Sequence, residues 1–275
     1  LAHRGPDDEG LWQEEEGRVG FAHTRLAVID LSGAAAQPMV SDCGRYRLVY
    51  NGEIYNYREL RAELEADGQI FRSQSDTEVL LCLLRRDGAE ALQRLVGMFA
   101  FALWDRQARQ LLVARDRLGI KPLVYAPLPG GGLAFASEIH ALAAHPGIDL
   151  DRDTEALSQY LACLYVPAPR TIHRGIRKLE PGHLLVWRDG KTEISSYWRP
   201  QVMGGRAPTA DQAVEELLPL LRRAVAGRMV ADVPVGCFLS GGIDSSVVAA
   251  LMAEEARRHG AQPVRTFTMT FDEAA

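Results

Sequence analysis

The 275-residue sequence has few cysteines, no long apolar run and no excess of basic residues. Its four cysteines lie far apart and form no CxxC pair, which argues against a disulfide scaffold or a zinc knuckle and favours a reducing compartment. No apolar run reaches the roughly 18 residues of a membrane helix, and no signal peptide is visible at the start. We therefore expect a cytoplasmic protein with no membrane partner.

The charge balance is slightly acidic. Lysine and arginine number 31 against 36 aspartates and glutamates, so the net charge is −5, which argues against nucleic acid as the main partner. Charged residues make up 24% and apolar residues 47% of the chain, as in ordinary globular proteins. The length allows one large domain or two smaller ones.

The first two thirds of the chain read as strands with two inserted helices. Leu60 and Leu64 predict a helix over 57–67, and Ser75 with Glu78 predicts a capping box that opens a second helix. The pair Asn51-Gly52 lies between apolar runs and predicts a hairpin turn. This pattern favours a layered α+β domain. Further strands are expected at 20–23, 26–29, 46–50, 98–104, 110–114, 133–136 and 184–187.

The pattern changes after residues 199–211, which have the Pro and Gly content of a linker. A helix is expected over 213–230, with Pro219 kinking or restarting it. The remaining elements are expected to be a strand at 233–239, a tight turn at 240–242, a helix at 245–259 and a strand at 264–271. This β-turn-α-β unit indicates the beginning of a parallel α/β domain.

The most specific chemical motif is the turn Ser240–Ser246, which reads SGGIDSS. Two glycines let backbone N–H groups face a bound anion, and the start of a helix adds a partial positive charge. Ser240 and Ser245 could donate to phosphate oxygens, and Asp244 could hold Mg²⁺. The loop lacks the ending of a Walker A motif and resembles the PP-loop of ATP pyrophosphatases. The alternative is a simple Gly-Gly turn with Asp244 capping a helix.

Several segments in the first part of the chain, taken in order and followed by this loop, resemble the glutamine-hydrolysing asparagine synthetases. The segments are HRGPDDEG (3–10), RLAVID (25–30), NGEIYN (51–56), SDTE (75–78), RDRLGIKP (115–122) and ASEI (136–139).

The resemblance implies two domains. Residues 1–198 would form a class II glutamine amidotransferase domain, an α+β domain with the N-terminal-nucleophile αββα sandwich. Residues 199–211 would be a linker. Residues 212–275 would begin an α/β, parallel-sheet PP-loop domain of the adenine nucleotide α hydrolase-like kind, which binds ATP.

The resemblance also implies roles for individual residues in binding glutamine. Arg25 would clamp the α-carboxylate with its forked donors. Asp76, helped by Glu53, would bind the α-ammonium. The Asn51 side chain and the Gly52 N–H would form an oxyanion hole. Backbone groups of Val28 and Ile29 would complete the pocket.

For ATP, the resemblance places Leu239 and Met269 beside the adenine and Ser240 and Gly241 at the phosphates. The rest of the ATP set is Gly242, Ser245 and Asp244, the last of these as the ligand of Mg²⁺.

Each of these residues also has a plainer interpretation. Arg25 could be a surface ion pair, Asn51-Gly52 only a hairpin turn, and Asp76 only a helix cap. Leu239 and Met269 could belong to an ordinary buried strand. The combination of segments favours the functional interpretation.

The family's nucleophile is a cysteine at position one of the mature protein, and this sequence opens with Leu1 instead. Cys43, Cys82, Cys163 and Cys237 match no catalytic position. We expect a sequence truncated at both ends, which would not hydrolyse glutamine by itself.

The implied function is ATP-dependent synthesis of asparagine from aspartate, using ammonia from glutamine and passing through β-aspartyl-AMP. The expected partners are therefore small molecules: glutamine, aspartate and ATP with Mg²⁺. A homodimer is compatible with the sequence, which does not determine the oligomeric state. The alternatives are a β-lactam synthetase-like ligase, a non-catalytic relic that binds glutamine or ATP, and a class II amidotransferase acting on sugars or phosphoribosyl groups, which should lack Ser240–Ser246.

Overall fold

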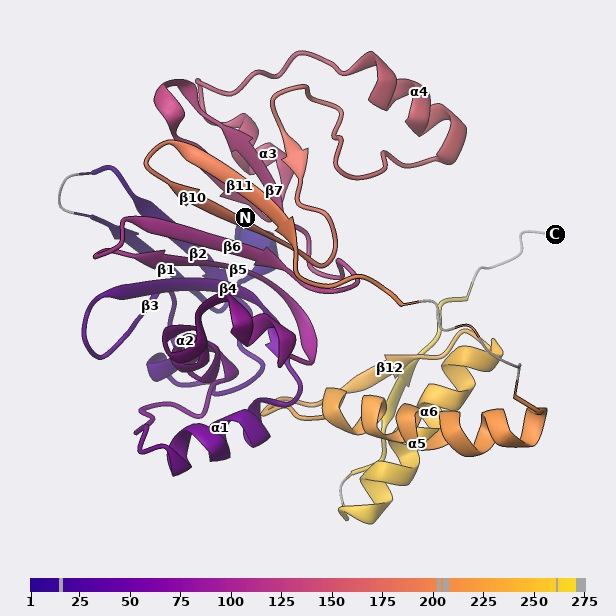
Figure 1. Cartoon of the computed structure of the whole chain (residues 1–275). Coiled ribbons are helices and arrows are strands. Elements are labelled where there is room, and N and C mark those ends of the chain that lie inside the picture. Colours follow the sequence, from indigo (N-terminus) through magenta and orange to yellow (C-terminus); the bar gives the residue numbers. More distant parts are fainter. Residues whose placement is uncertain (15–16, 202–203, 205–207, 261, 271–275) are drawn as a thin grey trace. The chain divides into compact units, whose positions relative to one another are not determined.

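The computed structural model describes residues 1–14, 17–201, 204, 208–260 and 262–270. The chain divides into two compact units, Leu1–Gln201 and Val202–Ala275 (Figure 1). The expected linker, 199–211, lies partly outside the described residues, and its last two residues already belong to a helix. In the described part of the chain, no helix is both long and apolar enough to cross a membrane.

The first unit is built around a six-stranded sheet with the order β11-β10-β6-β5-β4-β3. Every neighbouring pair of strands in it is antiparallel. The strands are β3 (Met39–Val40), β4 (Tyr46–Ile54), β5 (Gly97–Asp105), β6 (Gln110–Arg115), β10 (His183–Arg188) and β11 (Lys191–Ser196).

A second β layer covers one face of this sheet. It contains the hairpin β1-β2 and the three-stranded sheet β8-β7-β9. Phe21 of β2 and Tyr125 of β7 share one buried cluster with Val49, Trp104 and Val113 of the large sheet, so the main core lies between the β layers. The strands are β1 (Asp8–Gln13), β2 (Gly20–Arg25), β7 (Val124–Pro127), β8 (Leu133–Ala136) and β9 (Arg177–Lys178).

Helices lie outside both β layers. Alternation along β4 turns Tyr50 toward α2, where its hydroxyl reaches Asp76. On the other side, Leu142 of α3 packs against Val124 and Ala126 of β7. The order α, β, β, α confirms the predicted sandwich. The helices are α1 (Tyr57–Ala66), α2 (Asp76–Asp87), α3 (Ile139–Ala143) and α4 (Thr154–Cys163), with short 3₁₀ turns at Ala2–Arg4, Gly33–Ala35, Gly88–Gln93 and Pro129–Gly131.

The second unit contains two parallel strands, β12 (Gly236–Phe238) and β13 (Arg265–Phe267), with α6 (Ile243–Arg258) between them in the chain. This arrangement confirms the predicted start of an α/β domain. Helix α5 (Ala210–Arg228) packs on α6 around Val225, Leu251 and Met252. Residue 271, the last of the expected strand 264–271, lies outside the described residues.

Several local predictions were wrong. Asn51-Gly52 is not a hairpin turn: both residues lie inside β4, where they pair with Ala100 and Phe99 of β5. The apolar run 26–29 is a loop, not a strand. Pro219 does not restart the helix, because α5 is assigned as one helix that contains it.

The predicted capping box of α2 forms only in part. Ser75 accepts from the N–H of Thr77, but Glu78 does not return to Ser75. Instead its carboxylate accepts from the N–H groups of Arg72 and Ser73, at 3.0 and 2.7 Å. The glutamate therefore fixes the loop that precedes the helix.

Candidate glutamine cavity and phosphate loop

A cavity of about 500 Å³ opens in the first unit. It is lined by the end of β2 with the loop that follows, by the middle of β4, by the start of α2 and by the loop after β6. All seven residues predicted to bind glutamine lie on its wall: Arg25, Val28, Ile29, Asn51, Gly52, Glu53 and Asp76. These residues come from three separate sequence segments, and the fold brings their side chains and backbone groups together around one cavity.

Arg25 is the last residue of β2, and it is buried, with 8% of its surface exposed. Its guanidinium donates to the backbone carbonyls of Ser32, at 2.9 Å, and of Asp30. The Asp30 carboxylate in turn accepts from the N–H groups of Ser32 and Gln74, at 3.0 and 2.6 Å. A guanidinium has five N–H donors, so this loop orients the group and leaves donors for a carboxylate in the cavity.

Asp76 is the first residue of α2 and is 5% exposed. One carboxylate oxygen accepts from the Tyr50 hydroxyl at 2.8 Å and from the N–H of Ile54 at 2.9 Å. Among the described residues, no cation pairs with it. Burial raises the pKa of this carboxyl, although its hydrogen bonds oppose that shift. A buried anion without a cation fits an ammonium group of a ligand.

Asn51 and Gly52 reach the cavity from inside β4 rather than from a turn. A Cβ added at Gly52 would lie 2.4 Å from the Met98 carbonyl oxygen and 2.6 Å from the Tyr50 ring, so no side chain fits there. In the part of the chain described by the structure, the side-chain amide of Asn51 makes no hydrogen bond. Its donors therefore remain available on the cavity wall.

Sequence reasoning missed several residues of the wall, among them Arg4, His23 and Lys121. The Nε2 atom of His23 lies 3.1 Å from the carbonyl of Tyr50, which makes Nε2 the donor. Its Nδ1 is buried and has no hydrogen-bond partner in the described part of the chain. Burial lowers the pKa of His23. Arg4 and Lys121 belong to the segments HRGPDDEG and RDRLGIKP, and so the signal was present in the motifs that carried the resemblance.

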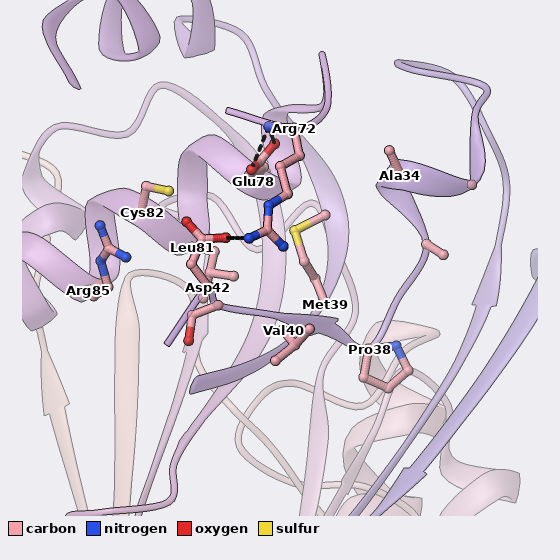
Figure 2. Close-up of a pocket in the computed structure, with 13 residues that line it drawn as sticks. Ala34, Pro38, Met39, Val40, Asp42, Arg72, Glu78, Leu81, Cys82 and Arg85 are labelled. Carbon is pink, nitrogen blue, oxygen red and sulfur yellow. Dashed lines mark hydrogen bonds and ion pairs between the residues drawn. The ribbon is translucent and has the colours of Figure 1, made fainter. Parts of the chain in front are cut away.

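Among the described residues, no cysteine lines this cavity. A second cavity in the same unit, about 320 Å³, contains Cys82 together with Met39, Arg72 and Arg85, and Figure 2 shows Arg72 between Asp42 and Glu78. Burial raises the pKa of the Cys82 thiol to about 11, so this sulfur is a poor nucleophile. None of the predicted glutamine-binding residues lines this second cavity.

The predicted phosphate loop joins β12 to α6 in the second unit. Gly241 has a φ of +83°, and an added Cβ there would meet nothing within 4 Å, so the backbone is open to a ligand. Ser240 and Ser245 lie 3.1 Å apart through their hydroxyls, and the Ser245 hydroxyl donates to the carbonyl of Gly242 at 3.1 Å. These bonds hold the two hydroxyls beside the start of the helix.

The other predicted ATP-binding residues flank this loop. Asp244 is exposed in the first turn of α6. Leu239 is half-buried, and its N–H donates to the Phe267 carbonyl at 2.8 Å. Met269 is 80% exposed, which contradicts the plainer interpretation of it as part of a buried strand. Among the described residues, no group of three or more His, Cys, Asp or Glu could hold a metal ion by itself.

Comparison with known families follows the same division of the chain. Residues 1–198 match the family described as "Glutamine amidotransferase domain". The chain belongs to this family. Beyond the amidotransferase domain, residues 216–275 match the family described as "Asparagine synthase".

Two curated relatives of this amidotransferase chain are named as asparagine synthetases. Asparagine synthetase [glutamine-hydrolyzing] 3 of Bacillus subtilis is 39% identical over 99% of the chain and 44% of its own length. A putative asparagine synthetase [glutamine-hydrolyzing] of Mycobacterium tuberculosis is 43% identical over 99% of the chain and 43% of its own length. The predicted resemblance to glutamine-hydrolysing asparagine synthetases is confirmed, and the chain spans less than half the length of these relatives.

Solved structures give a weaker likeness. Glutamine phosphoribosylpyrophosphate amidotransferase from B. subtilis, complexed with ADP and GMP, is 21% identical, with a TM-score of 0.45 over 90% of this chain and 51% of that one.

Proposed function

We propose that residues 1–198 bind glutamine as the nitrogen donor of an amide-forming ligase, and that residues 212–275 belong to its ATP-binding domain. The whole protein would hydrolyse glutamine to glutamate and ammonia. It would activate aspartate with ATP as β-aspartyl-AMP, and ammonia would then displace AMP to give asparagine. The names of two curated relatives support asparagine as the product and glutamine as the nitrogen donor. We place this activity in the cytoplasm.

The observation that carries the proposal is the gathering of seven predicted residues on one cavity wall. Arg25 supplies an oriented guanidinium for the α-carboxylate, and Asp76 with Glu53 supplies negative charge for the α-ammonium. Asn51 would donate to the amide oxygen as it gains charge, with the N–H of Gly52 as its partner. The loop residues Val28 and Ile29 would close the pocket around the bound amino acid. Because no cysteine lines the cavity, the proposal for this chain concerns the binding and orientation of glutamine.

Replacement of Arg25 tests the glutamine site. We expect Arg25→Ala to weaken binding of L-glutamine by more than about 30-fold, because a charge-assisted forked contact is lost, and to leave the first unit folded. Isothermal titration calorimetry measures the affinity. Tryptophan fluorescence reports folding, since Trp12, Trp104, Trp187 and Trp198 all lie in the first unit. Arg188→Ala, which removes an exposed arginine of β10, is the control. Unchanged glutamine affinity in a folded Arg25→Ala protein would refute the role of Arg25.

For ATP, we propose that the loop Ser240–Ser246 binds the phosphates, with Leu239 and Met269 beside the adenine. Asp244 would contribute the carboxylate for Mg²⁺, and this fits a metal that binds one or two carboxylates together with substrate phosphates. Ser240, Gly241, Gly242 and Ser245 would supply the backbone N–H groups and hydroxyls.

Replacement of Gly241 tests the phosphate loop. We expect Gly241→Val to abolish binding of Mg-ATP, because a side chain would occupy the open space over the backbone. Gly260→Val is the matched control, since Gly260 also has a positive φ, +62°, and open space around it, but lies outside the loop. Loss of ATP binding in both variants, or in neither, would contradict the role of the loop.

A further inference from the structure

Five charged side chains line the glutamine cavity: Arg4, Arg25, Glu53, Asp76 and Lys121. Arg4 donates to Glu138 at 2.8 Å, and Arg25 would take the α-carboxylate of the ligand. Asp76 and Glu53 would take the α-ammonium. Within the described residues the Lys121 ammonium makes no hydrogen bond and no ion pair, although the charges of Glu53 and Asp116 act on it. Zwitterionic glutamine, whose α-carboxylate is assigned to Arg25, does not need this further cation.

Lys121 is presented to the cavity by a rigid loop. The carboxylate of Asp116, 1% exposed, accepts from the N–H groups of Phe99, Leu118, Ile120 and Lys121 at 2.9 to 3.2 Å. The carbonyl of Lys121 itself accepts from the Arg115 guanidinium at 2.8 Å. Both backbone groups of the lysine are therefore hydrogen-bonded, which fixes the position of its Cα in the loop.

Strand register places this loop level with Asn51, the residue proposed to contact the side-chain amide of glutamine. Asn51 of β4 pairs with Ala100 of β5, and Ala100 pairs with Arg115, the last residue of β6. The loop that holds Lys121 starts at the next residue. Asp76, by contrast, is bonded to Ile54, three residues further along β4.

We propose that Lys121 binds the γ-carboxylate of glutamate, the product that glutamine hydrolysis leaves in the cavity. The inference rests on the proposed function, since both ligands use the same site. Glutamine has a neutral amide where glutamate has a second carboxylate, and a half-buried ammonium attracts the carboxylate far more strongly. The cavity therefore retains its product, and glutamate competes with glutamine for Arg25 and Asp76.

Burial and neighbouring charges act in opposite directions on the pKa of Lys121. Burial and the nearby charge of Arg4 lower its pKa, while Glu53 and Asp116 raise it. An anion bound beside the ammonium would stabilise its charged form and raise the pKa of Lys121 again.

The test compares two ligands on four proteins. Calorimetry measures the affinities of the full 275-residue chain for L-glutamate and for L-glutamine, in the wild type, Lys121→Met, Lys121→Arg and Lys191→Met. We expect Lys121→Met to weaken glutamate binding at least about tenfold and to change glutamine binding less than about threefold. Lys121→Arg, which keeps the charge, should retain most of the glutamate affinity. Lys191→Met, on exposed β11, should change neither.

The outcomes separate the inference from the proposed function. Equal weakening of both ligands in Lys121→Met, or no weakening of either, overturns the role of Lys121. A wild-type chain that binds glutamine but not glutamate overturns the inference alone. A wild-type chain that binds neither ligand overturns the proposed function and the inference with it.

Discussion

At the residue scale, Asp76 shows how a site for a cation can be built before the cation arrives. Its carboxylate is anchored by Tyr50 and Ile54 and is buried without a positive partner among the described residues. A carboxyl whose pKa is raised on folding holds its proton more tightly in the folded state. Ionising it in the folded state therefore lowers the free energy of unfolding once the pH rises above the pKa of the same carboxyl in the unfolded chain, about 3.9.

Replacing Asp76 by a neutral residue should change protein stability and glutamine affinity in opposite directions. We expect Asp76→Asn to raise the melting temperature at pH 7.5, because an amide can still accept from Tyr50 and Ile54 without a buried charge. The gain should shrink as the pH falls from 7.5 to 4, because protonation of the wild-type carboxyl removes its buried charge. Glutamine affinity should fall by more than about tenfold. Thermal unfolding at the two pH values and calorimetry check this. A variant less stable at pH 7.5, or with unchanged glutamine affinity, would contradict it.

Individual residues differ in how far the sequence could predict them. Arg25, Asp76 and their neighbours were found because they lie in motifs that resemble one family. The interpretation of Asn51-Gly52 as a turn was wrong because the hairpin signal is local. The nine-residue pairing of β4 with β5, a strand more than 40 positions away, outweighs that signal. Lys121 was missed because only the folded loop shows that its side chain faces the cavity.

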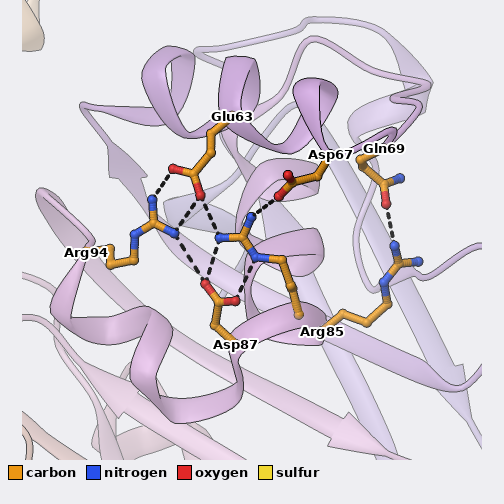
Figure 3. A network of polar contacts seen from close by, with 7 residues as sticks. Glu63, Asp67, Gln69, Arg85, Asp87 and Arg94 are labelled. Atoms are coloured by element: carbon orange, nitrogen blue, oxygen red, sulfur yellow. Dashed lines mark hydrogen bonds and ion pairs between the residues drawn. The ribbon is translucent and has the colours of Figure 1, made fainter.

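At the element scale, helices α1 and α2 are joined by an ion network. Glu63 of α1 pairs with Arg86 of α2 at 2.9 Å and also with Arg94, while Asp87 pairs with both arginines (Figure 3). Such exposed pairs are individually weak and screened by salt, but a network shares the cost of ordering its side chains. Because α2 carries Asp76 at its first residue, this network helps hold the cavity wall.

Two glutamates of α1 offer a matched test of that network. Glu63 contacts two arginines outside α1, whereas Glu65 pairs, among the residues that the structure describes, with Arg61 alone, one turn away. We expect Glu63→Gln to lower the melting temperature more than Glu65→Gln at low ionic strength, and 1 M NaCl to remove most of the difference. Thermal unfolding at both salt concentrations measures it. An equal or larger loss in Glu65→Gln would mean that the network adds nothing to a single helical pair.

The longer elements were the easier ones to predict. The apolar spacing of α1 and the Ser75 start and Gly88 end of α2 mark these helices within about one residue of their observed bounds. The two-residue strands β3 and β9 have no pattern of their own and exist through pairing with β4 and β7. Helix α5 includes Pro219 within its first three turns, where the sequence alone predicted a kink or a restart.

At the scale of the whole molecule, the sandwich could be predicted from the family resemblance but the strand order could not. The order β11-β10-β6-β5-β4-β3 depends on pairings such as β10 with β6, which lie about 70 positions apart in the chain. That order matters for function, because it sets Asn51 level with the loop that holds Lys121 and leaves Arg25 and Asp76 to come from outside the large sheet.

A crystal structure of the 275-residue chain with L-glutamine would show directly whether this cavity is the glutamine site. We predict glutamine in the cavity, with its α-carboxylate on the Arg25 guanidinium, its α-ammonium at Asp76 and its amide beside Asn51. Glutamine bound elsewhere on the protein, or bound with its α-carboxylate away from Arg25, would contradict the proposed site.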